Sequence, residues 1–168
     1  MSRSASAAEQ IPSRSFGKLL PLCYWSHLRY HQHMQHSSNI QSNTMSCSSA
    51  PTFWYKILDQ PPPSPLPETL PPTDLDAHDG FIHLSTASQI PITAGLFFQS
   101  HKSIWVLKLR RDKIDGRVEY PPGLGESCPH IHDSHTGLGK HNVEDVIELQ
   151  REEGQKWAEV PEMAKLEG

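Results

Sequence analysis

The sequence is poor in cysteine and lacks long apolar runs, and both features narrow the class of protein. The three cysteines, Cys23, Cys47 and Cys128, are odd in number and irregularly spaced, which argues against a disulfide framework and fits a reducing compartment. No apolar run approaches the ~20 residues that a membrane-spanning helix needs. We therefore expect a cytoplasmic protein that does not span a membrane.

Basic residues are in the minority as well. The chain has 15 Lys and Arg against 19 Asp and Glu, which gives a net charge of −4. Nucleic-acid-binding domains usually carry a basic surface, so the composition predicts no nucleic-acid partner. The length of 168 residues allows one domain and a tail.

Acidic residues are nearly absent from residues 1–51, where Glu9 is the only one. This segment is rich in serine and has no sustained hydrophobic periodicity, so we do not expect it to join the fold. Two interpretations stay open. It is a disordered extension, or it is an organellar transit peptide, since such peptides are rich in Ser and Arg and poor in acids. A transit peptide would make the protein mitochondrial.

The order of expected strands and helices in residues 52–165 predicts a single α+β domain. Apolar and β-branched residues predict strands at 53–58, 81–84, 103–109, 117–120 and 143–149, with a further extended stretch around residues 130–132. One helix is predicted within 88–100, where Ile90, Ala94, Phe97 and Phe98 have the spacing of a buried helical face. The strand at 103–109 is apolar on both faces, which is typical of a central strand.

Proline dominates the segment between the first two strands. Residues 60–73 hold seven of the 15 prolines. Proline lacks the backbone N–H that helices and central strands require. We therefore predict an extended surface loop in place of the helix that a compact fold would usually carry there.

The most informative stretch is Asp79-Gly80-Phe81-Ile82-His83-Leu84-Ser85-Thr86. It predicts a turn, a short strand and a helix start, with Ser85 or Thr86 as the N-cap. Side chains alternate along a strand, so Ile82 and Leu84 would face the core and His83 the opposite side. An imidazole beside a helix N-terminus can contact an anion or a sugar hydroxyl. A core histidine bonded to a backbone carbonyl is the alternative.

A second polar cluster lies at Glu126, Cys128, His130, His132, Asp133 and His135. Three interpretations of it stay open. His130 and His132 on one face could bind a metal with Asp133 or His135. Cys128 with His130 could be a nucleophile and its base.

The third interpretation combines the two clusters into a nucleotide or sugar site. His83 and His130 would supply the hydrogen bonds, and Glu119 or Glu126 the charge. A carboxylate near a ribosyl anomeric carbon can stabilise a developing oxocarbenium ion. A solvated surface charge is the alternative for each glutamate.

Three stretches together resemble a known family: residues 54–57 (Trp-Tyr-Lys-Ile), residues 79–86, and residues 126–132 (Glu-Ser-Cys-Pro-His-Ile-His). They resemble the landmarks of domain of unknown function 952. The resemblance implies an ADP-ribosyltransferase-like fold, a split twisted β-sheet with one or two short helices around a cleft. In enzymatic members of that fold the cleft holds NAD, and a histidine at the position of His83 contacts the ribose.

Residue by residue, the resemblance implies His83, Glu119, Glu126 and His130 as catalytic candidates. It implies His83, Ser85, Thr86 and His130 as the NAD-binding set. Several positions depart from the family pattern, and these are Cys128 for phenylalanine, Val118 for tryptophan, His132 for tyrosine, Asp133 for glycine and an insertion at 134–140.

The leading hypothesis is an NAD-dependent transferase or glycohydrolase that acts on a small nucleotide-like ligand. A non-catalytic module that binds a small ligand or a metal at His130 and His132 is the alternative. The sequence does not indicate the oligomeric state.

Overall fold

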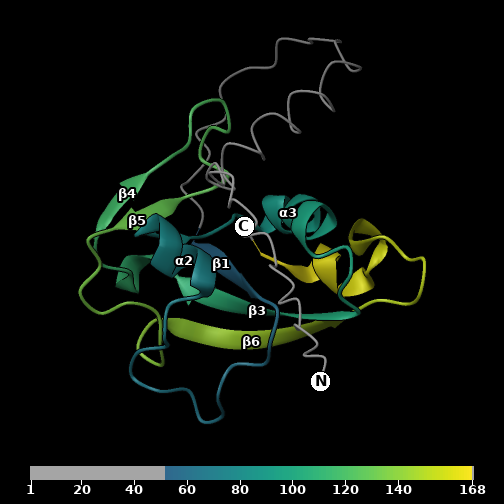
Figure 1. Cartoon of the computed structure of the whole chain (residues 1–168), viewed down its shortest axis with the longest axis horizontal. Coiled ribbons are helices and arrows are strands. Elements are labelled where there is room, and N and C mark those ends of the chain that lie inside the picture. Colours follow the sequence, from purple (N-terminus) through teal and green to yellow (C-terminus); the bar gives the residue numbers. More distant parts are fainter. Residues whose placement is uncertain (1–51, 168) are drawn as a thin grey trace, which may run out of the picture.

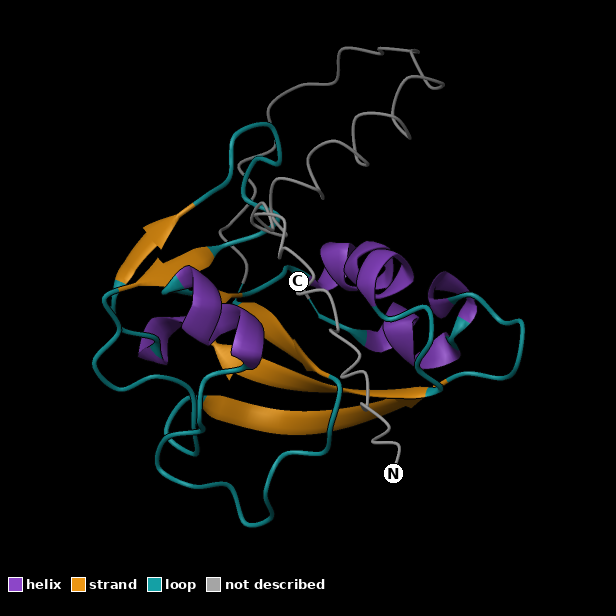
Figure 2. Ribbon diagram, in the orientation of Figure 1, coloured by secondary structure: helices purple, strands orange, loops and turns teal. Residues whose placement is uncertain are grey.

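The computed structural model of the protein describes residues 52–167, which form two small β-sheets and a few short helices (Figures 1 and 2). Residues 1–51, the predicted extension, lie outside the described part. The strands are β1 (Phe53–Leu58), β2 (Ile82–His83), β3 (Ser103–Arg110), β4 (Arg117–Glu119), β5 (His130–His132) and β6 (Val143–Gln150). The α-helices are α2 (Asp74–Asp79) and α3 (Ile90–Phe97). Short 3₁₀ turns lie at Ala87–Gln89, Arg111–Lys113, Trp157–Glu159 and Pro161–Lys165.

The larger sheet has the order β1-β3-β6, and both pairings are antiparallel. Its central strand β3 is buried on both faces. Ile104 and Val106 face one side and Leu107 and Leu109 the other, and all four are fully buried. The prediction of a central strand with two apolar faces is confirmed, because such a strand packs against a separate core on each side.

The first core lies where α3 and the C-terminal 3₁₀ turns cover one face of the larger sheet (Figure 1). Ile90 and Ala94 of α3 are fully buried there beside Trp157. The Trp157 indole N–H donates to the Phe98 carbonyl at 2.9 Å, so this large side chain is buried without losing its hydrogen bond. This contact docks the C-terminal 3₁₀ turns onto α3.

The smaller sheet has the order β2-β5-β4 and is also antiparallel. An isolated bridge between Tyr55 and Ser85 connects it to β1, with a hydrogen bond of 2.9 Å in each direction. The second core draws on both sheets, since Trp54 and Leu107 of the larger one pack with Ile131 of the smaller. The six strands and two α-helices of the described residues confirm the α+β class.

A helix that the sequence analysis did not predict follows the proline-rich loop. Residues 60–73 hold no helix or strand, as expected, but α2 begins at once after them. The Thr73 hydroxyl caps it by accepting from the Asp76 N–H at 3.2 Å, and Gly80 ends it in the left-handed conformation. The predicted turn at Asp79 and Gly80 is therefore the end of a helix. Six residues are too few to show a hydrophobic period.

The segment after β2 also differs from the expectation. Thr86 precedes a 3₁₀ turn, its side chain makes no capping bond, and the α-helix begins only at Ile90 with Pro91 in its first turn. Phe97, which was predicted to lie on the buried face, is 39% exposed. It ends α3 and lines a cavity between this helix and the smaller sheet instead of packing in the first core.

No helix in the 52–167 region is long and apolar enough to cross a membrane.

Candidate functional site

The two histidines that the motifs singled out lie side by side in the smaller sheet. His83 of β2 pairs directly with His130 of β5, and Glu119 of β4 pairs with His130 on its other side. Directly opposed residues of antiparallel strands point to the same face. His83, His130 and Glu119 therefore form one row across the sheet. Sequence reasoning proposed these residues, and the fold brings them together.

An aromatic ring binds the histidines into a cluster. The Phe81 ring lies 4.5 Å from the rings of both His83 and His130 and 4.7 Å from that of His132, measured between centroids. The rings of His83 and His130 are 5.0 Å apart, edge to face. The prediction that His130 and His132 share one face is confirmed, because both contact this ring.

A buried ion pair between Lys56 and Asp76 contacts the His83 side chain. The Asp76 carboxylate accepts two hydrogen bonds from the Lys56 ammonium at 2.7 and 2.5 Å. The same carboxylate lies 2.9 Å from His83 Nδ1 and accepts from the His83 backbone N–H at 3.1 Å. Lys56 and Asp76 are about 5% exposed. An ionised Asp76 keeps a proton on Nδ1 of His83 and so fixes the orientation of the ring.

The electrostatics of this ion pair keep Asp76 ionised. Burial by itself would raise the pKa of Asp76, but the hydrogen bonds from His83 and the charge of Lys56 outweigh it and lower the pKa to about 2. Burial lowers the pKa of Lys56, and Asp76 opposes that change. A second carboxylate, Asp79, lies 3.3 Å from His83 Nε2, so both ring nitrogens face acidic groups.

His130 has the opposite electrostatic environment. Its residue is 8% exposed. Burial, reinforced by the neighbouring His83 and His132, lowers the pKa of His130 to about 4. His130 is therefore neutral at pH 7 and can both accept and donate a hydrogen bond.

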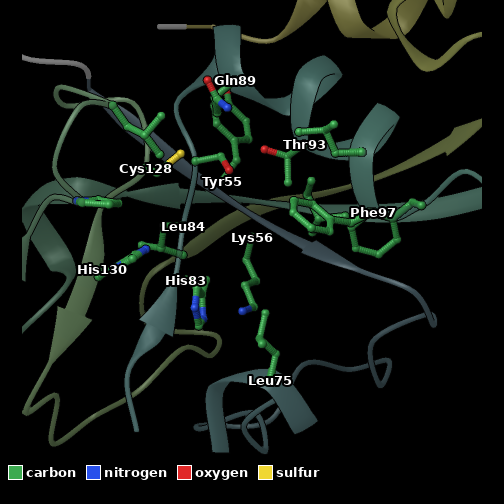
Figure 3. A pocket seen from close by; sticks show the side chains of 16 residues that line it. Tyr55, Lys56, Leu75, His83, Leu84, Gln89, Thr93, Phe97, Cys128 and His130 are labelled. Carbon is green, nitrogen blue, oxygen red and sulfur yellow. The ribbon is translucent and has the colours of Figure 1, made fainter. Parts of the chain in front are cut away.

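Lys56, His83 and His130 line a cavity of about 330 Å³ that lies between the two sheets and α3 (Figure 3). We call it the histidine cavity. Its volume is at the lower end of the range of roughly 300–1,000 Å³ for small-molecule sites. Most of its wall is apolar. The lining residues are Tyr55, Lys56, Ile57, Leu75, His83, Leu84, Ser85, Gln89, Thr93, Leu96, Phe97, Phe98, Pro121, Leu124, Cys128 and His130.

The remaining predicted residues are divided between the cavity and its surroundings. Ser85 lines the cavity, whereas Thr86 does not. Glu119 lies outside it at the end of the histidine row, with its side chain 50% exposed, paired with Arg117 and 3.5 Å from His132. Glu126 is exposed in the loop between β4 and β5 and is not part of the row.

Sequence reasoning missed Lys56 and Asp76. One signal was available for Lys56, which is the only charged residue in the apolar strand β1. A charged side chain in such a strand must find a partner if it is buried. Nothing local identified Asp76 as that partner, because 20 residues separate the two.

A second cavity of about 480 Å³ lies on the other side of the ion pair, and we call it the loop cavity. It is bounded by the proline-rich loop, α2 and the segment 133–138. Lys56 and Asp76 line it, and Lys56 also lines the histidine cavity. The ion pair thus stands in the wall between the two.

The structure gives the metal interpretation no support. Among residues 52–167, no three His, Cys, Asp or Glu side chains are placed to share a metal ion. His135 and Asp133 line the loop cavity, while His130 lines the histidine cavity. Cys128 lines the histidine cavity with His130, and a nucleophilic role for it stays a prediction.

Comparison with known proteins supports the family resemblance. Residues 66–148 match the family described as "Protein of unknown function (DUF952)". This match includes the motifs at residues 79–86 and 126–132, and it begins after the motif at residues 54–57. No curated protein matches the chain.

Two similar solved structures are crystal structures of protein CC0527 from Caulobacter crescentus, one of them of a double mutant. The mutant is 22% identical with a TM-score of 0.47, and the other structure is 24% identical with a TM-score of 0.45. Each match covers 60% of this chain and 89% of the other.

Proposed function

We propose that this chain, whose residues 66–148 match the DUF952 family, binds a nucleotide-like small molecule in the histidine cavity. NAD is the leading candidate ligand. One observation carries the proposal: His83 and His130, from two separate motifs, are paired neighbours on the wall of a largely apolar cavity. A few placed polar groups in an apolar cleft are the usual composition of a small-molecule site.

The lining suits one part of NAD better than the whole. A planar ring and its ribose match the volume of about 330 Å³, the aromatic wall and the hydrogen-bonding side chains. Lys56 is the only Lys or Arg in that lining, and Asp76 already offsets its charge. We therefore assign the nicotinamide–ribose part to the cavity and the charged diphosphate to the solvent outside it.

We also propose that the fold is ADP-ribosyltransferase-like. The support is the split of the strands into two three-stranded sheets that meet at the bridge between Tyr55 and Ser85. The cavity lies at this split, with β1 on one side and the paired strands β2 and β5 on the other.

A transferase or glycohydrolase reaction would use the histidine row. The bond between the nicotinamide nitrogen and the ribose carbon breaks, and nicotinamide leaves with the electron pair. Water or an acceptor hydroxyl then adds to the carbon and releases its proton to the solvent. His83 and His130 would hold the ribose. Glu119, two strand spacings or roughly 10 Å from His83, would stabilise the positive charge on the ribose.

Thermal unfolding of the full chain with and without NAD tests the binding. A ligand at about 100-fold its Kd adds about 2.7 kcal/mol, which raises the melting temperature by roughly 10 °C for a domain of this size. We expect His83→Ala to abolish the shift and the exposed His135→Ala to keep it. No shift with NAD, or an equal shift in His83→Ala, would contradict the proposal.

Nicotinamide release from NAD tests the reaction. We expect Glu119→Gln to lower the rate while the NAD-induced shift in melting temperature persists, since Glu119 does not line the cavity. Glu126→Gln is the matched control. An equal loss in both variants would contradict the assignment of Glu119.

Non-catalytic binding of the same class of ligand is the second candidate function. A specific observation favours it, because neither Glu119 nor Glu126 lines the cavity. NAD-dependent stabilisation without nicotinamide release would support this candidate over the enzyme.

A further inference from the structure

The Lys56 ammonium is a buried donor on the wall of the histidine cavity. Its side chain is 6% exposed. In Figure 3 it runs from β1 with its nitrogen toward the end of the cavity where His83 and Leu75 lie. A charged group in this position faces any ligand that enters the cavity.

The ammonium has one more hydrogen than the protein uses. A lysine ammonium carries three N–H donors. Both hydrogen bonds that Lys56 makes within residues 52–167 go to the same carboxylate, that of Asp76, at 2.7 and 2.5 Å. Buried donors are normally bonded, and Lys56 lines the histidine cavity, so an acceptor on a ligand there would complete its hydrogen bonds.

The charge balance indicates which acceptor fits. Asp76 offsets the charge of Lys56, and His130 is neutral at pH 7. The second carboxylate near His83, that of Asp79, adds further negative charge beside the site. An anion would lose its hydration without meeting an unbalanced cation on Lys56, whereas a neutral oxygen would gain a hydrogen bond at a smaller desolvation cost.

We infer that Lys56 donates its third hydrogen to an uncharged carbonyl oxygen of the ligand and selects a carboxamide over a carboxylic acid. This inference rests on the proposed function and names the group that it recognises, the carboxamide of a nicotinamide-like ring. Leu75 and Leu84 line the same cavity and supply apolar surface for that ring.

A series of small ligands tests the inference without changing the protein. Nicotinamide, acetylpyridine, nicotinate and ethylpyridine share a ring but differ in the acceptor: an amide, a ketone, an anion and none. We expect the full chain, titrated by NMR, to bind the first two with similar affinity. Ethylpyridine should bind at least tenfold more weakly, since the lost hydrogen bond from a charged donor accounts for that factor. Nicotinate should also bind at least tenfold more weakly, because its carboxylate loses its hydration without meeting an unbalanced cation.

A variant assigns the preference to Lys56. Lys56→Arg keeps a cation that can pair with both oxygens of Asp76, so we expect it to fold, as circular dichroism would verify. The guanidinium of this variant does not place an N–H where the lysine ammonium has its third hydrogen. The preference for nicotinamide over ethylpyridine should therefore fall to less than threefold. Lys108→Arg, at a lysine that pairs with Glu167 and does not line the cavity, is the matched control and should keep the full preference.

The outcomes separate this inference from the proposed function. If NAD binds but nicotinamide and ethylpyridine bind equally, the role of Lys56 is refuted and the nucleotide site stands. If small amides bind with the expected preference but NAD does not, the role of Lys56 stands and the nucleotide is refuted. If nothing binds, both are refuted.

Discussion

Acid should destabilise this fold well before its carboxylates titrate, because His130 is buried as a neutral group. The residue is 8% exposed, and burial beside His83 and His132 lowers its pKa to about 4. In the unfolded chain the pKa of a histidine is about 6.5. Below that pH the unfolded chain takes up a proton that the folded protein does not bind.

The sign and the magnitude of the pH dependence of stability follow from this difference in the pKa of His130 between the folded and the unfolded protein. The contribution of neutral His130 is fully present above pH 6.5 and is lost as the pH falls toward 4. Each pKa unit is worth about 1.4 kcal/mol, so the interval between 6.5 and about 4 corresponds to about 3 kcal/mol. Most of that loss, about 2.5 kcal/mol, should be reached by pH 4.5. Asp76 adds little in this range, since its pKa is lowered to about 2 and its contribution is lost mainly below about pH 4.

Urea unfolding followed by tryptophan fluorescence measures the effect on the full chain. We expect the free energy of unfolding of the unmodified protein to fall between pH 7 and pH 4.5. His130→Gln should lose about 2.5 kcal/mol of that dependence, and His135→Gln, whose histidine is exposed, should keep it. Parallel pH profiles for the unmodified protein and His130→Gln would refute the reasoning.

Three further predictions concern stability at pH 7. Asp76→Asn leaves the buried ammonium without a counter-charge and should lower the free energy of unfolding by about 3–5 kcal/mol; a urea midpoint within error of the unmodified protein would contradict this. Gly139→Ala would put its Cβ 1.9 Å from the Glu68 carbonyl oxygen and should abolish or severely weaken folding. Gly95→Ala, with open space around it in α3, should raise the free energy of unfolding by about 0.5–1 kcal/mol in thermal melts. The reverse order of stability would show the packing to be wrong. Trp157→Ala should cost about 3–5 kcal/mol by calorimetry, and a change under 1 kcal/mol would remove this residue from the core.

Local patterns predicted the strands well, for a reason that β3 illustrates. An apolar run such as residues 103–109 is unstable in water whatever its neighbours are, so its composition alone indicates a buried strand. The motif at residues 79–86 likewise identified His83, and the alternation of side chains put it opposite the core-facing Leu84. The helix α2 was not foreseen, because its stability depends on capping by Thr73 and Gly80 instead of on a repeating apolar face.

Long-range pairing decided the rest of the site. The sequence determined that Lys56 is a cation in an apolar strand and that His83 and His130 belong to two motifs. Only the tertiary structure decided that Asp76 neutralises Lys56, that the two histidines are neighbours, and that Glu119 rather than Glu126 continues their row. The physical reason is that burial and hydrogen bonding act between residues that are close in space. Which residues become close depends on which distant strands pair. The local pattern of a strand determines which of its faces is buried, but it does not identify the partner strand.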